Sequence, residues 1–196
     1  MKSRFLSGIG IVTIMLFLAS CGKLPQTQID AANAAVAAAK TEQADIYVPA
    51  EFTALQDSLN ASLAEVEVQK SKFLKKYGDV TVKLESVVTT ATQVKESAIA
   101  RKEAVRLEVE ALMTEMNTLV AENKELITKA PKGKEGMAAL TEIQNEMTVI
   151  ETSVAEAATI FANGEYMAAL DKLNAAKVNA TNINTELKEA IAKVRR

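Results

Sequence analysis

The sequence DVTVKLESVVTTATQVKESAIARKEAVRLEVEALMTEMNTLVAENKELITKA fills residues 79–130 and contains neither glycine nor proline. Apolar side chains recur along it at intervals of three and four residues, which is typical of an amphipathic helix. At 1.5 Å per residue, an uninterrupted helix over this stretch is about 75 Å long. The stretch therefore predicts a single long helix in the middle of the chain.

The apolar spacing of this stretch changes near Val105. Up to that residue the intervals alternate between four and three, and then two intervals of four follow from Arg101 through Val105 to Val109. Such a stutter locally unwinds a supercoil and moves the buried face around the helix. We therefore expect the long helix to change packing partners near Val105, with the Arg101 side chain extending to solvent at the junction.

Glycine and proline are sparse in the rest of the chain and mark the ends of the other expected helices. The breaks fall at Pro25, Pro49, Gly78, residues 131–136 and Gly164. Between them apolar residues again recur at helical intervals, and no stretch shows a sustained period of two. We predict an all-α fold, an antiparallel helical bundle or coiled coil with two tandem three-helix units that share the long central helix.

The chain contains what we interpret as an internal repeat, in which the second unit follows the pattern of the first and carries one inserted residue before the matched tyrosine. The repeat and the stutter together predict helical unit one over residues 27–104 and helical unit two over residues 105–196. The matched positions are Phe52–Gln56 with Leu140–Gln144, Phe73 with Phe161, and Tyr77 with Tyr166. Phe73 also ends the apolar stripe of the second expected helix, so we expect it to be buried like Phe161.

The first residues have the organisation of a secretion segment. Met1–Arg4 is basic, Phe5–Leu18 is apolar and uncharged, and small residues then lead to Cys21. The apolar run is too short to cross a bilayer comfortably as a stop-transfer helix. The alternatives are a chance cysteine beside an ordinary signal-peptide cleavage site, and an anchor that is retained.

Leu-Ala-Ser-Cys at residues 18–21 resembles a bacterial lipobox. The resemblance implies cleavage between Ser20 and Cys21 and attachment of a lipid to the Cys21 sulfur. Each buried methylene of an acyl chain contributes about 0.8 kcal/mol of membrane affinity, so two or three chains hold a protein firmly. We predict a lipoprotein signal peptide over residues 1–20 and a lipidated tether over residues 21–26.

The predicted anchor also indicates a location in the cell envelope. Gly22 follows the cysteine. In the lipoprotein sorting that the lipobox resemblance implies, an aspartate at that position signals retention in the inner membrane. Its absence favours the periplasmic face of the outer membrane, with the membrane lipid around Cys21 as the first expected partner.

Composition excludes several classes of function. The chain has no histidine, and Cys21 is its single cysteine, so the common nucleophile–base pairs and zinc sites are missing. Without residues 1–20, the remaining 21 basic and 25 acidic residues give a formal charge of −4, which argues against a nucleic-acid partner. Pro131–Gly136 lacks the spacing of a phosphate-binding loop. We predict no enzyme activity, no cofactor and no metal.

Three stretches are similar to a family of uncharacterised bacterial domains found in short envelope lipoproteins. They are the alanine-rich Ala31–Ala39, the step YVPAEF at residues 47–52, and the turn GEYMAALDKL at residues 164–173. The first unit departs from the family pattern, because Lys75-Lys76-Tyr77 stands where Gly-x-Tyr is usual. The resemblance implies an alanine-rich helical fold and an envelope location. Because the family has no established activity, the resemblance assigns no functional residue.

These observations favour a membrane-anchored, non-catalytic helical scaffold or protein-interaction element of the cell envelope. The alternative is a helical binding module for a peptide, a glycan or a small ligand in the periplasm. Envelope proteins are the expected partners, and self-association into a homo-oligomer stays open because coiled-coil faces are left over. Four apolar residues beside the stripes are candidates for an exposed patch or for flanking core positions: Val68, Val88, Leu170 and Ile191.

Overall fold

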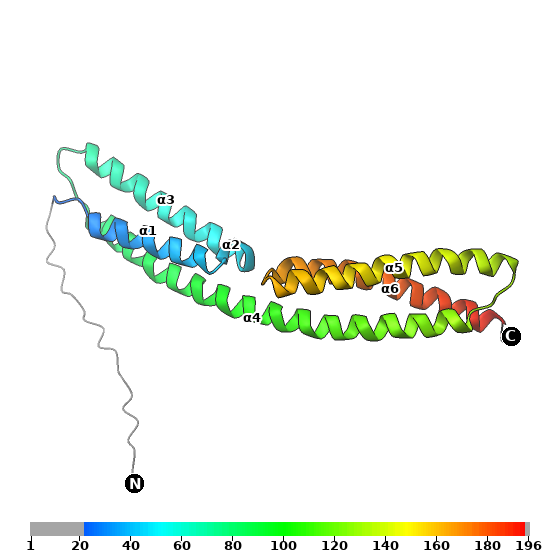
Figure 1. The fold of residues 1–196 in the computed structure, drawn as a ribbon. Coiled ribbons are helices and arrows are strands. Elements are labelled where there is room, and N and C mark those ends of the chain that lie inside the picture. Colours follow the sequence, from blue (N-terminus) through cyan, green and yellow to red (C-terminus); the bar gives the residue numbers. More distant parts are fainter. Residues whose placement is uncertain (1–21, 195–196) are drawn as a thin grey trace, which may run out of the picture.

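The computed structural model describes residues 22–194, without the side chains of residues 134 and 135. Within this range the chain is helical, with no strand, and the predicted all-α bundle fold is confirmed (Figure 1). The helices are α1 (Gln26–Thr41), α2 (Ala44–Tyr47), α3 (Pro49–Ser71), α4 (Gly78–Lys129), α5 (Lys134–Ala162) and α6 (Tyr166–Val194). Gln26, predicted to belong to the tether, is the first residue of α1.

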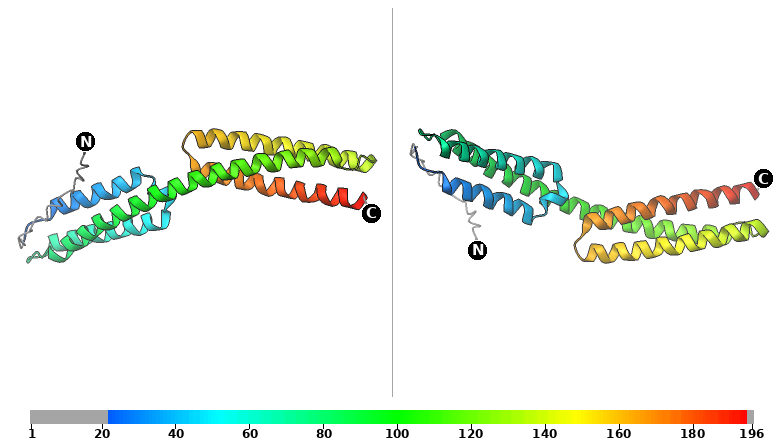
Figure 2. Two further views of the ribbon diagram at one scale, coloured as in Figure 1. Left: turned by 90° about the horizontal axis from the view of Figure 1, so that it is seen from below. Right: turned by 90° about the horizontal axis from the view of Figure 1, so that it is seen from above.

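Helix α4 is the long central helix that the glycine- and proline-free stretch predicts. Its 52 residues correspond to a length of about 78 Å. Helices α1, α2 and α3 pack on its first half, and α5 and α6 pack on its second half (Figures 1 and 2). We call these two assemblies the proximal bundle and the distal bundle. Both views of Figure 2 show an elongated molecule with α4 running through its whole length.

The proximal bundle has an alanine-lined core. Ala32 and Ala39 of α1 are completely buried, as is Ala98 of α4, and the exposed fraction of Ala91 is 1%. Small side chains at these positions let the α1 and α4 backbones approach closely, and larger residues such as Leu84 complete the same buried cluster. Pro49, one of the expected breaks, begins α3, where the N–H that proline lacks is not needed for a helical hydrogen bond.

The distal bundle buries larger side chains between α4, α5 and α6. Met116 of α4 and Leu173 of α6 are fully buried, and Ile150 of α5 is 2% exposed. Helices α5 and α6 are joined by a Schellman turn at Gly164, whose φ is +83°. The Gly164 N–H donates to the Phe161 carbonyl at 2.9 Å and the Glu165 N–H donates to the Ile160 carbonyl at 3.2 Å, which satisfies the end of α5.

The buried face of α4 shifts at Lys102 rather than at Arg101. Arg101 is exposed and forms a long ion pair with Glu108 at 3.9 Å, so its predicted position on the apolar stripe is wrong. The stripe runs instead through buried Ala98, half-buried Lys102 and buried Val105. Two consecutive intervals of four residues therefore end at Lys102. The buried face shifts there, three residues before Val105, which is where the sequence predicts the shift.

Phe73 is the second departure from the sequence-based expectations. Helix α3 ends at Ser71 without a left-handed glycine, and Lys72 leaves it in an extended conformation with ψ 145°. The chain therefore runs outward before it reaches Gly78, and the Phe73 side chain is 100% exposed instead of buried. Its repeat partner Phe161 is half-buried against the distal core, because the Gly164 turn folds the chain back at once.

A buried polar pair links α4 to α6 inside the distal bundle. Asn123 of α4 has no exposed surface, and its amide donates to the Ala180 carbonyl at 2.8 Å. Asn184 of α6 donates in turn to the Asn123 side-chain oxygen at 2.7 Å. Because a slip of either helix leaves these groups unpaired in an apolar core, the pair specifies the register between α4 and α6.

Replacing Asn123 with alanine tests that role. Asn123→Ala leaves the Asn184 amide without its buried acceptor, and we expect the free energy of unfolding to fall by about 1–3 kcal/mol. Asn117, which is exposed on the same helix, provides the control, and Asn117→Ala should change the stability by less than about 0.5 kcal/mol. Denaturant unfolding followed by circular dichroism measures both, and equal effects of the two substitutions contradict the register role.

Candidate functional site

The predicted lipidation and cleavage residues, Cys21 and Ser20, lie outside the described residues. The chain becomes described at Gly22, from which it leads through Pro25 into α1. The start of α1 lies at the same end of the molecule as the connector between α3 and α4, as all the views show (Figures 1 and 2). We call this the proximal end, and the opposite end, where α4 turns into α5, the distal end.

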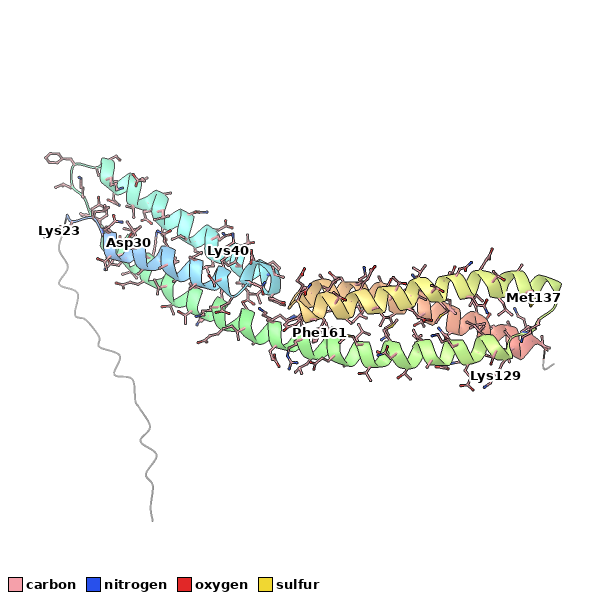
Figure 3. All side chains as sticks on the ribbon, viewed as in Figure 1. Lys23, Asp30, Lys40, Lys129, Met137 and Phe161 are labelled. Carbon is pink, nitrogen blue, oxygen red and sulfur yellow. The ribbon has the colours of Figure 1, made fainter. Side chains whose placement is uncertain are left out.

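The proximal end carries an apolar and basic surface. Phe73 is 100% exposed and Leu74 is 73% exposed, both in the connector between α3 and α4. Lys72, Lys75 and Lys76 of the same connector are exposed as well. Lys23 lies at this end in Figure 3. Exposed side chains of this kind have no structural task in the core, so the proximal end is the first candidate interaction surface.

At the distal end a short connector joins α4 to α5. A Cβ atom added at Gly136, in the first turn of α5, would lie 2.4 Å from the Pro131 carbonyl oxygen, so the turn requires glycine there. Met137 is 52% exposed next to this turn and is labelled in Figure 3. The segment around residues 131–136 is therefore a helix connector, as its sequence predicts, although Gly133 ends the loop and Gly136 belongs to α5.

The proximal and distal bundles meet around Tyr47 of α2. Its side chain is 6% exposed, and it belongs to the buried cluster of the distal bundle although α2 packs in the proximal bundle. The Lys102 ammonium lies 5.9 Å from the centre of the Tyr47 ring, within the range of a cation–π interaction. Burial raises the pKa of the Tyr47 hydroxyl, and the backbone N–H of Tyr166 at the start of α6 opposes that shift.

The Tyr47 contact therefore connects three elements at the point where α4 changes its partners. Phe161 at the end of α5 and Tyr166 at the start of α6 pack against each other, with ring centres 5.2 Å apart and ring planes tilted by 44°. Figure 3 shows Phe161 at the edge of the distal bundle that faces α2. Large, stiff aromatic side chains from α2, α5 and α6 thus lie at the facing ends of the two bundles, and Tyr47 among them lies against Lys102.

Two open grooves lie on the sides of the bundles. One, of about 340 Å³, lies between α3 and α4 and is lined by small and polar residues that include Ser58, Ser62, Ser86 and Thr90. The other, of about 380 Å³, lies between α5 and α6. Its lining residues are Glu146, Val149, Ile150, Asn179, Asn182, Ile183 and Glu186. In the first groove Glu65 and Lys83 line the wall beside the hydroxyl groups and form an ion pair with each other.

The four apolar residues singled out beside the stripes do not form one patch. Leu170 is buried in the distal core, and Ile191 packs against its edge. Val88 packs against the proximal core, whereas Val68 is 53% exposed on α3. Three of the four are core or flanking positions, so they do not define a binding surface.

Most carboxylates of α4 form ion pairs. Arg106 binds Glu103 through two hydrogen bonds of 2.7 and 2.8 Å and Glu110 through one of 2.5 Å. The bonds from Arg106 lower the pKa of Glu103. Hydrogen bonds from Lys188 and Asn184 likewise lower the pKa of Glu122. Carboxylates held in their charged form beside cations suit a solvated surface rather than proton transfer near neutral pH.

The ion pairs also connect helices within the distal bundle. They link α4 to α6 and α5, and α5 to α6: Lys177–Glu115 at 2.7 Å, Lys188–Glu122 at 2.8 Å, Lys124–Glu151 at 3.0 Å and Lys172–Glu156 at 2.5 Å. Exposed pairs of this kind contribute little stability each, but they favour one arrangement of the helices over its alternatives.

Within residues 22–194, no helix has the length and apolarity needed to cross a bilayer. The same part of the chain holds no cluster of three or more acidic side chains arranged to bind a metal ion. Comparison with protein-family models, curated proteins and solved structures found no significant match. The resemblance to envelope lipoproteins drawn from the sequence therefore stays a prediction.

Substitution of Tyr47 tests whether this side chain stiffens the junction. Tyr47→Ala removes a buried ring, with a packing cost of about 3 kcal/mol, and should let the two bundles move relative to each other. Tyr47→Phe keeps the ring and serves as the control. A chain starting at Gly22 has no cysteine, so cysteines at Asn60 of α3 and Thr148 of α5 can be spin-labelled selectively.

The expected result is a broader distance distribution between the two labels in Tyr47→Ala than in Tyr47→Phe, with unchanged helix content. Both labelled positions are exposed, so the labels themselves leave the cores intact. Identical distributions in the two variants would show that α4 alone holds the bundles in place.

Proposed function

We propose that this protein is a lipid-anchored helical rod that acts as a non-catalytic scaffold in the bacterial cell envelope. The observation that carries the proposal is the shared helix α4, which extends for about 78 Å and belongs to both bundles. A helix that closes two cores cannot fold back on itself without opening one of them. The protein therefore presents two surfaces, the proximal and the distal end, at a constant separation.

The position of the predicted anchor supports this proposal. Cys21 directly precedes the described chain, and α1 begins at the proximal end. A lipid on Cys21 therefore attaches the membrane to one end of the rod, and the distal end lies farthest from it along α4. The exposed, ion-paired faces between the two ends suit contact with water and with other envelope proteins.

The grooves favour a second candidate function, a helical binding module. Half of the residues that line the groove between α3 and α4 carry a hydroxyl group, and Lys83 and Glu65 form an ion pair there. Such a surface offers hydrogen bonds to a peptide backbone or to a glycan. A compact, closed particle in solution would favour this function over the rod.

Small-angle scattering on the chain starting at Gly22, with its molar mass measured in the same run, tests the rod. For a thin rod about 78 Å long we expect a radius of gyration above about 22 Å, against about 16 Å for a compact domain of this size. A monomer with the larger value supports the scaffold. A monomer with the compact value contradicts it and makes the binding module the leading function.

Replacement of Cys21 tests the anchor separately. In bacteria, the full chain should fractionate with membranes and should gain the mass of its acyl chains, because several chains together bind a bilayer firmly. Cys21→Ser should lose that mass. Gly22→Ala, which leaves the cysteine in place, is the matched control. A chain whose mass and fractionation do not depend on Cys21 would exclude the lipid anchor.

A further inference from the structure

The connector between α3 and α4 exposes apolar side chains that no core of the described chain uses. Phe73 and Leu74 have the highest exposed fractions among the described large apolar residues, 100% and 73%. Tyr77, a few residues farther on, is 5% exposed and closes the end of the proximal core. The connector therefore has one buried aromatic residue that holds it in place and two apolar residues that face outward.

The same connector has a strongly basic composition. Residues 69–78 contain four lysines and no acidic residue, in a chain whose formal charge is −2. Lys70 forms an ion pair with Glu67 at 2.6 Å. The other three are Lys72, Lys75 and Lys76, which flank Phe73 and Leu74 on both sides and are exposed. Apolar side chains surrounded by lysines match the chemistry of a membrane interface, with acyl chains below anionic phosphates.

The connector also lies where a membrane would be. It shares the proximal end with Gly22, which directly follows Cys21 in the sequence. A bilayer that holds Cys21 is therefore within reach of the connector. The opposite end of the rod has a tight turn around Pro131 and lies far from this bilayer.

We propose that residues 72–76 are a second membrane contact, in which Phe73 and Leu74 enter the interface of an anionic phospholipid bilayer while the lysines bind its phosphate groups. The contact rests on the proposed anchoring through Cys21, which supplies the bilayer. A single flexible attachment leaves the rod free to lie down. Two attachments, at the start of α1 and between α3 and α4, restrict its tilt.

A tryptophan at residue 73 tests the contact, because the natural chain has no tryptophan. The full chain carrying Phe73→Trp is reconstituted in vesicles of phosphatidylethanolamine and phosphatidylglycerol, with and without brominated acyl chains. Met137→Trp, an exposed apolar position at the distal end, is the matched control. We expect blue-shifted emission and strong quenching by the brominated lipid for residue 73, and neither for residue 137.

The lysines give a second readout. Replacing Lys72, Lys75 and Lys76 with glutamine should lower the equilibrium constant for insertion of residue 73 by about fivefold for each lysine. Leaving phosphatidylglycerol out of the vesicles should lower the same constant, because it removes the anionic lipid that the lysines bind. Unquenched, water-exposed emission from residue 73 in vesicles that carry the protein would overturn the membrane contact. So would a blue shift that occurs without vesicles and grows with protein concentration, because it would assign the connector to a second copy of the chain.

Flotation of the same vesicles separates the two proposals. If the chain does not float with them, the Cys21 anchor has failed, and a titration with excess vesicles still reports insertion of residue 73. If the chain floats but residue 73 stays unquenched, the anchor stands and the second contact fails.

Discussion

Every part of this fold depends on α4 remaining one helix while its buried face turns. The proximal bundle needs Leu84 and Ala98 facing α1 and α3, and the distal bundle needs Val105 and Met116 facing α5 and α6. The absence of glycine and proline keeps the helix continuous, and the two consecutive four-residue intervals that end at Lys102 rotate its apolar stripe. A break in the backbone at that point would leave two bundles joined by a hinge.

Much of this arrangement could be predicted from residue spacing, because helix faces follow directly from a period of 3.6. The extent of α4, the start of α3 at Pro49 and the turn at Gly164 are examples. The outward position of Phe73 could not be predicted in this way, since an apolar residue at helical spacing looks the same before and after the helix has ended. The sequence does carry a local indication of this difference. Lys75 stands where the matching turn of the second unit has Gly164, so the first unit lacks the glycine that lets α5 turn directly into α6.

Polar residues inside the stripes were the harder part to predict. Lys102 rather than Arg101 fills the junction, and neither residue is apolar, so hydropathy could not choose between them. Asn123 was missed although the stripe has an interval of seven residues from Leu119 to Leu126, a gap that points to a buried polar residue midway. The predicted lipidation at Cys21 depends on a motif, and the described residues start directly after it.

The order of the helices along the rod has a mechanical consequence. Helix α1 starts at the proximal end and α6 finishes at the distal end, and each lies alongside α4 (Figure 2). Tension applied between Gly22 and Val194 would therefore act parallel to the α1–α4 and α4–α6 interfaces and load all of their side-chain contacts at once. Unzipping, in which contacts yield one after another, is not available in this geometry. A pull between the two ends of the described chain therefore meets the shear resistance of both interfaces together.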